Sequence, residues 1–322
     1  MVARGGGLLL GYAADRVFAD PQRWHPVAGF GRFSQAVEAR WYADSGSRGA
    51  AHTGSLVGAV LAGGILAERL APSPAARTLV TALATWVVLG GRTLEREATD
   101  VLACLNREDD GDLGPARQQV ARLVGRDTEH LDESGISRAV IESVAENTSD
   151  AVVAPLVWGA LAGVPGLLGY RAVNTLDAMV GHHSERYERY GGTAARLDDL
   201  VNLPGSRLSG LLTLIAVPRR ASLAWRAWRR DSSAHPSPNA GVVEAAFAGA
   251  LGIRLGGTNR YYGNRIEDRP IMGQGRAARP EDIDAATRIA RRIGWLAAFG
   301  ASGVCLGIGL GARRRSDSGL TG

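Results

Sequence analysis

Ala151-Val-Val-Ala-Pro-Leu-Val-Trp-Gly-Ala-Leu-Ala-Gly-Val-Pro-Gly-Leu-Leu-Gly-Tyr170 is a run of twenty residues without a charge. Its length matches the roughly 20 residues that a helix needs to cross the core of a bilayer. Val164-Pro165-Gly166 lies inside the run and is typical of a turn. We therefore predict two short helices that form a re-entrant or protein-covered hairpin, with the polar residues on either side of it at the same, cytoplasmic face.

Further apolar segments extend this pattern along the chain. Residues 293–312 form a second uncharged run of membrane-spanning length, and residues 53–67 and 78–91 predict a helical hairpin that turns near Pro72-Ser73-Pro74. Residues 208–217 are a weaker candidate. With about four to five such segments, we expect an all-α, polytopic integral membrane protein, one membrane domain over residues 1–322. The alternative is a soluble helical enzyme whose core helices are apolar.

The amino-acid composition excludes several kinds of catalytic and binding site. All 37 basic residues are arginine, against 32 acidic residues, which gives a net charge of +5. Without lysine, a Schiff base and a P-loop are excluded, so arginine, backbone amides or a metal ion must hold any phosphate. Cys104 and Cys305 are too few and too far apart in sequence for a disulfide framework or a thiolate zinc site. The basic residues form no long run with interleaved aromatic residues, so we expect no nucleic-acid partner. Membrane lipid and anionic small molecules explain the basic charge equally well, and we expect membrane lipid as a partner.

Three acids precede the apolar run. Glu142, Glu146 and Asp150 are spaced i, i+4, i+8, which predicts one helical face, with Asn147 beside them. Because like charges at this spacing repel, a divalent cation or a substrate ammonium would stabilise the stripe. The alternative is a solvated helix end whose acids complement a helix dipole.

A mixed polar group follows the apolar run. Arg171, Asn174 and Asp177 step by three residues and share one face of a helix, next to Thr175. A face with a cation, an amide and an acid recognises polar ligands better than it packs. Further on, Asp198, Asp199 and Asn202 offer oxygen ligands on adjacent turns, which suit a hard cation such as Mg²⁺.

Two prolines stiffen the segment His235-Pro-Ser-Pro-Asn-Ala-Gly241. Asn239 is a candidate N-cap for the helix that follows. On spacing alone, this segment is a connector, and the glycines of Gly256-Gly257 indicate a turn.

Together these blocks resemble the CobD/CbiB family, the adenosylcobinamide-phosphate synthases of cobalamin biosynthesis. The resemblance covers nearly the whole chain. The blocks that carry it are Asp20-Pro21, His25-Pro26-Val27, Glu142-Ser-Val-Ala-Glu-Asn-Thr-Ser-Asp150, Ala154-Pro-Leu156, Tyr170-Arg-Ala-Val-Asn-Thr-Leu-Asp177, Ala195-Arg-Leu-Asp-Asp199, His235 to Gly241 and Leu255-Gly-Gly257. The clearest departure is Gly181-His182-His183, where family members often carry a Gly-Tyr-Lys type sequence.

The resemblance implies a multi-pass enzyme of the bacterial inner membrane, an acid-amine ligase. Such an enzyme links aminopropanol, or its O-phosphate, to the free propionate of cobyric acid and so produces cobinamide or its phosphate, alone or with a partner subunit. An unactivated carboxylate does not condense with an amine in water, so ATP and Mg²⁺ are the expected cofactors.

The expected roles are distributed over the three polar groups. We expect the catalytic residues to be Glu142, Glu146, Asp177 and Asp199, with Glu142 as a candidate acceptor of the ammonium proton. The expected metal ligands are Glu146, Asp150, Asp198, Asp199 and Asn202. The expected substrate- or phosphate-binding residues are Arg171, Asn174, Thr175, Arg196, Arg207, His235, Ser237 and Asn239.

Two other classes of protein are alternatives. A membrane prenyltransferase binds Mg²⁺ diphosphate through acidic motifs, and Asn174-x-x-Asp177 begins one, but Gly181 stands where the next aspartate belongs. A transporter or a non-catalytic AmpE-like sensor also has broken helices and intramembrane polar residues. Only the synthase predicts ATP turnover that depends on an amine.

Overall fold

The computed structural model describes the chain except for residues 21–24, 108–110, 183, 262–264 and 319–322, and the side chains of 260–266 and 311–318 are likewise not described. Pro21 and His183 of the sequence blocks above lie outside the described residues. The described chain is mostly helical, as the sequence predicts, and it also contains a two-stranded antiparallel β-hairpin that the sequence pattern did not reveal.

Two compact units divide the chain. The first unit contains residues 1–90, 154–202 and 296–322, and the second contains residues 91–153 and 203–295. The expectation of a single domain stays a prediction.

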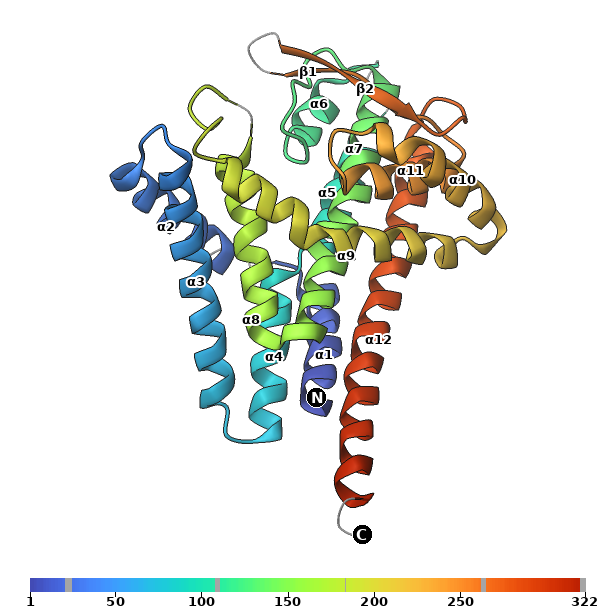
Figure 1. Cartoon of the computed structure of the whole chain (residues 1–322). Helices are drawn as coiled ribbons and strands as arrows, with labels where there is room; N and C mark the ends of the chain where they lie inside the picture. The colour runs from blue at the N-terminus through green and yellow to red at the C-terminus, as the bar shows by residue number, and fades with distance from the viewer. Residues whose placement is uncertain (21–24, 108–110, 183, 262–264, 319–322) are drawn as a thin grey trace. The chain divides into compact units, whose positions relative to one another are not determined.

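Helices make up the first unit (Figure 1). They are α1 (Val2–Phe18), α2 (Pro26–Trp41), α3 (Gly46–Leu70), α4 (Pro74–Val88), α8 (Ala154–Leu176), the π-helical η2 (Asp177–Gly181), the start of α9 (Gly192–Ala216) and the end of α12 (Pro280–Ser318). The predicted hairpin of α3 and α4 is confirmed. Its turn ends where the Ser73 hydroxyl accepts a hydrogen bond from the N–H of Ala76, 3.1 Å away, and so caps α4.

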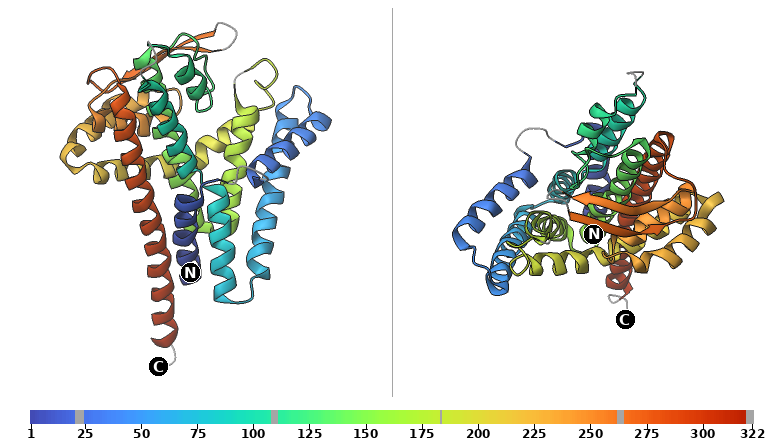
Figure 2. Two further views of the ribbon diagram at one scale, coloured as in Figure 1. Left: turned by 180° about the vertical axis from the view of Figure 1, so that it is seen from behind. Right: turned by 90° about the horizontal axis from the view of Figure 1, so that it is seen from above.

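The second unit combines helices with the β-hairpin. Its helices are α5 (Gly91–Leu105), α6 (Gly114–Val120), α7 (Glu133–Thr148), η1 (Ser149–Val153), η3 (Pro218–Arg220), α10 (Ala221–Asp231), η4 (Ser232–Ala234) and α11 (Ala240–Leu251), with the remaining parts of α9 and α12. Strands β1 (Leu255–Tyr261) and β2 (Arg265–Met272) pair antiparallel, with a bulge between Leu255 and Gly257, and Figure 2 shows them from above as a ribbon. The positive φ of Gly256 and Gly257 permits this bulge.

Within the described residues, three helical segments are long and apolar enough to cross a membrane, namely Gly46–Leu70, Glu133–Gly181, which contains a break at Gly163, and Pro280–Leu310. A fourth is added if α9 and residues 218–234, which meet at a bend of 102°, count as one span. These helices confirm a polytopic membrane protein. The predicted segment 78–91 lies mostly in α4, whose 15 residues are fewer than a full span needs.

The predicted break in the long apolar run is confirmed. Gly163 has φ 69° and ψ −146°, outside the helical region, and α8 doubles back there. A Cβ atom placed on Gly159 would lie 2.9 Å from Cδ2 of Leu167. In a continuous helix, eight residues would separate these two positions by about 12 Å, so the two arms of α8 run side by side. The shared cytoplasmic face of the flanking polar groups stays a prediction.

Small residues bring α1 and α4 together, and Figure 2 shows the two helices adjacent. Gly7 and Gly11 are one helical turn apart on α1. A Cβ atom on Gly7 would lie 2.5 Å from Cβ of Thr81, and one on Gly11 would lie 2.5 Å from the carbonyl oxygen of Ala82. This spacing of two glycines is typical of closely packed membrane helices.

Candidate active site

The acidic stripe of the sequence lies at the end of α7 in the second unit. Glu142 and Glu146 are on α7, and both line a cavity of about 130 Å³. Asp150 lies in the π-helical segment η1, where the rotation per residue differs from that of an α-helix, and it is not among the residues that line this cavity. Glu142 and Glu146 therefore share the cavity, and a common face with Asp150 stays a prediction.

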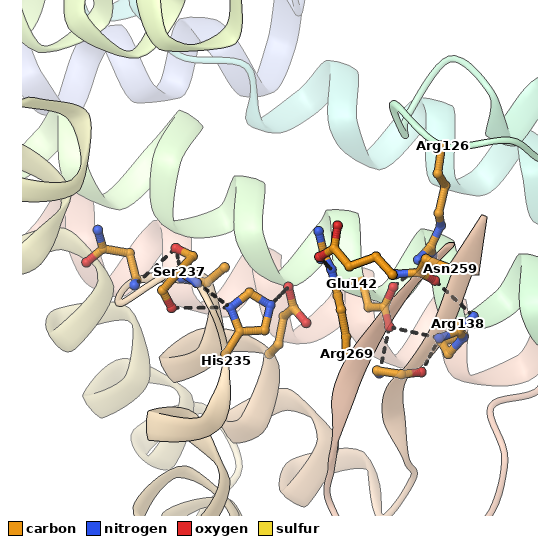
Figure 3. Close-up of polar contacts among 12 residues, drawn as sticks. Arg126, Arg138, Glu142, His235, Ser237, Asn259 and Arg269 are labelled. Atoms are coloured by element: carbon orange, nitrogen blue, oxygen red, sulfur yellow. Dashed lines mark hydrogen bonds and ion pairs between the residues drawn. The ribbon is translucent and has the colours of Figure 1, made fainter. Parts of the chain in front are cut away.

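Two groups donate hydrogen bonds to the carboxylate of Glu142. Its Oε2 accepts a hydrogen bond from the guanidinium of Arg126, 2.7 Å away, and its Oε1 accepts one from the backbone N–H of Gly256, 2.8 Å away. Arg138, one turn earlier on α7, lies 3.8 Å from Oε1. Figure 3 shows Arg126, Arg138 and Asn259 around this carboxylate. The contacts of Glu142 are those of a buried ion-pair network, in which loss of one partner leaves an uncompensated charge.

The β-hairpin completes this network. Arg126 and Arg138 both donate to the side-chain oxygen of Asn259 on β1, and Arg138 also donates to the backbone carbonyl of Gly256. The bulge at Gly256 and Gly257 therefore connects β1 to α7 through Glu142 and the two arginines. Sequence analysis identified these glycines as a turn but did not connect them with the acids.

Glu244 on α11 is the residue that sequence analysis missed. Its side chain is 1% exposed, and neither carboxylate oxygen has a hydrogen-bond partner among the described residues. Burial raises the pKa of Glu244 well above its ordinary value, and the nearby carboxylates of Glu142 and Glu146 raise it further. A lone acid in the apolar segment Ala240–Leu251 is energetically unfavourable, and this feature of the sequence could have identified it.

His235 is the nearest basic side chain to Glu244. Its Nε2 lies 3.9 Å from Oε1 of Glu244, while its Nδ1 accepts a hydrogen bond from the backbone N–H of Ser237, 3.0 Å away. Figure 3 shows the ring between Ser237 and a carboxylate. Burial lowers the pKa of His235, so a neutral imidazole is favoured beside Glu244.

The loop before α11 differs from the prediction in one respect. Asn239 occupies the N-cap position, but its side chain does not cap the helix. Its Oδ1 instead accepts hydrogen bonds from Ser206, at 2.9 Å, and from Arg207, at 2.7 Å. The hydroxyl of Ser237 accepts a hydrogen bond from the N–H of Ala240 at 3.2 Å, and so Ser237 replaces Asn239 in the capping role.

The cavity gathers opposite charges in a small volume. Its charged lining residues are Arg126, Glu142, Glu146, Glu244 and Arg269, all in the second unit. Glu142 is already paired, whereas Glu244 is buried without a hydrogen bond to any residue that the structure describes. Such a site can accept an ammonium group or a cation at the acids and an anionic oxygen at the arginines. Within the described chain, no three His, Cys, Asp or Glu side chains form a metal-binding cluster by themselves.

The other predicted group lies in the first unit, where α8 and α9 bring its amides and an acid together. The carboxylate of Asp198 accepts hydrogen bonds from Asn202, at 2.8 Å, and Asn174, at 3.3 Å, and Tyr170 donates to Asn202 at 2.6 Å. Arg171 lies 3.3 Å from the side-chain oxygen of Asn174. These hydrogen bonds bring the segment that follows the apolar run next to Asp198 and Asn202.

The remaining predicted residues of the first unit differ in exposure. Arg196 and Asp199 are exposed, and the hydroxyl of Thr175 donates to the carbonyl of Arg171 in its own helix, 2.7 Å away. Asp177 begins η2, and its carboxylate lies where a Cβ atom on Gly181 would be. The acids expected to bind Mg²⁺ thus belong to both units, and their role as metal ligands stays a prediction.

Comparisons with known proteins agree with the sequence blocks. The family model described as CobD/Cbib protein matches residues 8–290. The chain is 48% identical over 291 residues to the "Cobalamin biosynthesis protein CobD" of Mycobacterium tuberculosis, covering 89% of this chain and 91% of that protein. Proteins of the same name from Chromobacterium violaceum and Rhodobacter capsulatus are 43% and 39% identical, over 88% and 83% of this chain and 90% and 85% of theirs. No solved structure matches the chain.

Proposed function

Because the chain belongs to the CobD/CbiB family, we propose that it acts in cobalamin biosynthesis and joins the free propionate of cobyric acid to aminopropanol, or to its O-phosphate, in an ATP-dependent reaction. The product is cobinamide or cobinamide phosphate. We place the enzyme in the bacterial cell membrane, with its active face in the cytoplasm.

One observation carries this proposal. Glu244 is buried, with no hydrogen bond to a described residue, in a cavity that also contains Glu146, Arg126 and Arg269. A buried carboxylate with a raised pKa is suited to accept a proton from an ammonium group, and paired guanidinium donors bind carboxylate or phosphate oxygens. Amide synthesis from an acid and an amine requires both abilities.

The reaction proceeds in two steps. Transfer of the terminal phosphoryl group of ATP to a propionate oxygen forms an acyl phosphate and ADP. The amine nitrogen then attacks the carbonyl carbon, the C–N bond forms, and inorganic phosphate leaves with the electrons of the C–O bond. We assign the ammonium proton to Glu244 rather than to Glu142, because Arg126 and Gly256 already occupy both oxygens of Glu142.

The arginines hold negative charge during both steps. Arg269 would bind the phosphate of the acyl phosphate or a corrin carboxylate, beside the positive charge of Arg126, whose terminal nitrogens donate to Asn259 and Glu142, and so stabilise the charge that develops on the leaving group. Oxygen ligands are the type that Mg²⁺ requires, so Glu146 would supply a carboxylate ligand to a Mg²⁺ ion beside the phosphate, while Glu244 is reserved for the proton. Bound there, Mg²⁺ would neutralise charge on the transferring phosphoryl group.

The test uses the purified full chain with cobyric acid, ATP and Mg²⁺, and with aminopropanol or its O-phosphate in parallel. We expect ADP release that depends on both cobyric acid and an amine, together with an amide product identified by its mass. ADP release that is independent of the amine, or the absence of an amide, would contradict the proposal. Release of diphosphate from a prenyl diphosphate would support the prenyltransferase alternative instead.

A further inference from the structure

A cavity of about 650 Å³ lies in the first unit, away from the acids described above. It is lined by the first turn of α1, the end of α3, the start of α4 and Gly309 of α12. Its charged residues are Arg4, Glu68, Arg69 and Arg77. Three cations and one acid therefore surround a space much larger than a water molecule.

The single acid does not neutralise this cavity. Glu68 accepts a hydrogen bond from the backbone N–H of Val164, 2.9 Å away, and its nearest cation is Arg4 at 3.9 Å. Arg4 itself donates to the carbonyls of Ala160 and Leu161, each 3.3 Å away. Glu68 and Arg4 are thus both engaged with the broken part of α8.

The other two arginines have no acidic partner in the described part of the chain. Arg77 donates from Nε to the backbone carbonyl of Ala71, 3.2 Å away, which leaves its terminal nitrogens available. Arg69 has neither a hydrogen bond nor an ion pair with any described residue and is exposed. Two guanidinium groups beside one cavity are suited to a phosphate, which such groups bind with paired hydrogen bonds.

The surroundings of the cavity indicate what carries that phosphate. Arg69 is at the end of α3, a helix long and apolar enough to cross a membrane, and a cation at the end of such a helix is expected where lipid head groups meet the apolar core. Leu66 on α3 is 56% exposed, and Leu79 on α4 is 60% exposed. A ligand with an anionic head and apolar chains would therefore contact both the arginines and these leucines.

We propose that this cavity binds the phosphate-bearing head group of an anionic membrane phospholipid. The head group occupies the space between Arg69 and Arg77, and the acyl chains follow the exposed faces of α3 and α4. Because Arg4 and Glu68 line the same cavity and also hold the tip of α8, a bound lipid stabilises that tip.

The test compares phosphatidylglycerol with phosphatidylcholine, using the purified full chain in detergent. Native mass spectrometry counts the lipids that are retained, and thermal unfolding measures their effect on Tm. We expect preferential retention of phosphatidylglycerol and a rise in Tm that phosphatidylcholine does not produce. The double variant R69Q/R77Q, which removes both cations, should weaken retention of phosphatidylglycerol roughly tenfold. The variant R69K/R77K keeps the charges and should retain part of the preference for phosphatidylglycerol.

Arg48→Gln is the matched control, because Arg48 is an exposed arginine on the opposite end of α3 and does not line the cavity. It should leave the lipid preference unchanged. Equal retention of the two lipids by the native chain would overturn the proposal. So would loss of the preference in Arg48→Gln to the same extent, or an equal rise in Tm with inorganic phosphate alone. The measurement on the native chain tests the proposal even if R69Q/R77Q fails to fold.

Discussion

The carboxylate of Glu68 on α3 accepts a hydrogen bond from the backbone N–H of Val164, 2.9 Å away, at the point where α8 breaks. Gly163 ends the first arm of α8, so the N–H of Val164 has no partner within a helix. Arg4 donates to the carbonyls of Ala160 and Leu161 at the end of the first arm. One acid and one base thus satisfy the opposite ends of a broken helix, as apolar surroundings require.

Glu68→Ala should lower the stability of the chain. Removal of the acceptor leaves a part-buried N–H without a partner, at a cost of about 1–3 kcal/mol. Glu68→Gln retains an acceptor oxygen and should have a smaller effect. Thermal unfolding in detergent measures both, and Glu185→Gln, an exposed acid of the same unit, is the control. Equal stability of the Ala variant and the native chain would show that the hydrogen bond does not support the break.

Gly11→Ala should separate α1 from α4. The added methyl group would lie 2.5 Å from the carbonyl oxygen of Ala82, so a backbone must shift, and we expect a loss of about 1–3 kcal/mol. Gly54→Ala on α3 is the matched control, because a Cβ atom there has no neighbour within 4 Å. In a helix this change is neutral or stabilising, by up to about 1 kcal/mol. A similar change in Tm for the two variants would contradict close packing at Gly11.

Glu244→Gln should separate activity from stability. Loss of the proton acceptor should lower amide formation by roughly 10²–10⁴-fold. Glu281→Gln, at an exposed acid of the same unit, should leave activity unchanged. Full activity of Glu244→Gln would contradict the role of Glu244 while leaving the family reaction in place.

The stability of Glu244→Gln relative to that of the native chain should depend on pH. The pKa of Glu244 is higher in the folded chain than its ordinary value of 4.5, so the folded state favours the protonated form. The contribution of Glu244 to the stability of the native chain is fully present below pH 4.5. It is lost as the pH rises through the pKa that Glu244 has in the folded chain. The Tm of Glu244→Gln minus that of the native chain should therefore increase with pH above 4.5. A difference that is constant with pH would contradict the raised pKa.

Asp199→Asn tests the acids of the first unit. Asp199 is exposed, so the variant should unfold at the same temperature as the native chain. If its carboxylate binds Mg²⁺ during phosphoryl transfer, ADP release should fall by orders of magnitude. Asp44→Asn, another exposed acid of this unit, is the control. Normal turnover in Asp199→Asn would remove this residue from the catalytic set.

Structural features that depend on adjacent residues could be predicted from the sequence. The break within residues 151–170 was predicted from Val164-Pro165-Gly166, and the non-helical residue is Gly163. Proline and glycine act through their own backbone, so their effect can be recognised without the fold. The β-hairpin was missed because its strands, with Asn259, Asp268 and Pro270, do not alternate between polar and apolar residues.

The sequence by itself determined the helical membrane class, the hairpin within the long apolar run and the family, because uncharged length and ordered motif blocks are properties of the chain alone. Only the tertiary structure distinguished Glu142 from Glu244. Glu142 meets Arg126 and Gly256, which are 16 and 114 residues away in sequence, and it is neutralised by them. Glu244 is buried and has no such partner in the part of the chain that the structure describes. Whether a buried acid is paired depends on side chains that the fold brings together from distant segments.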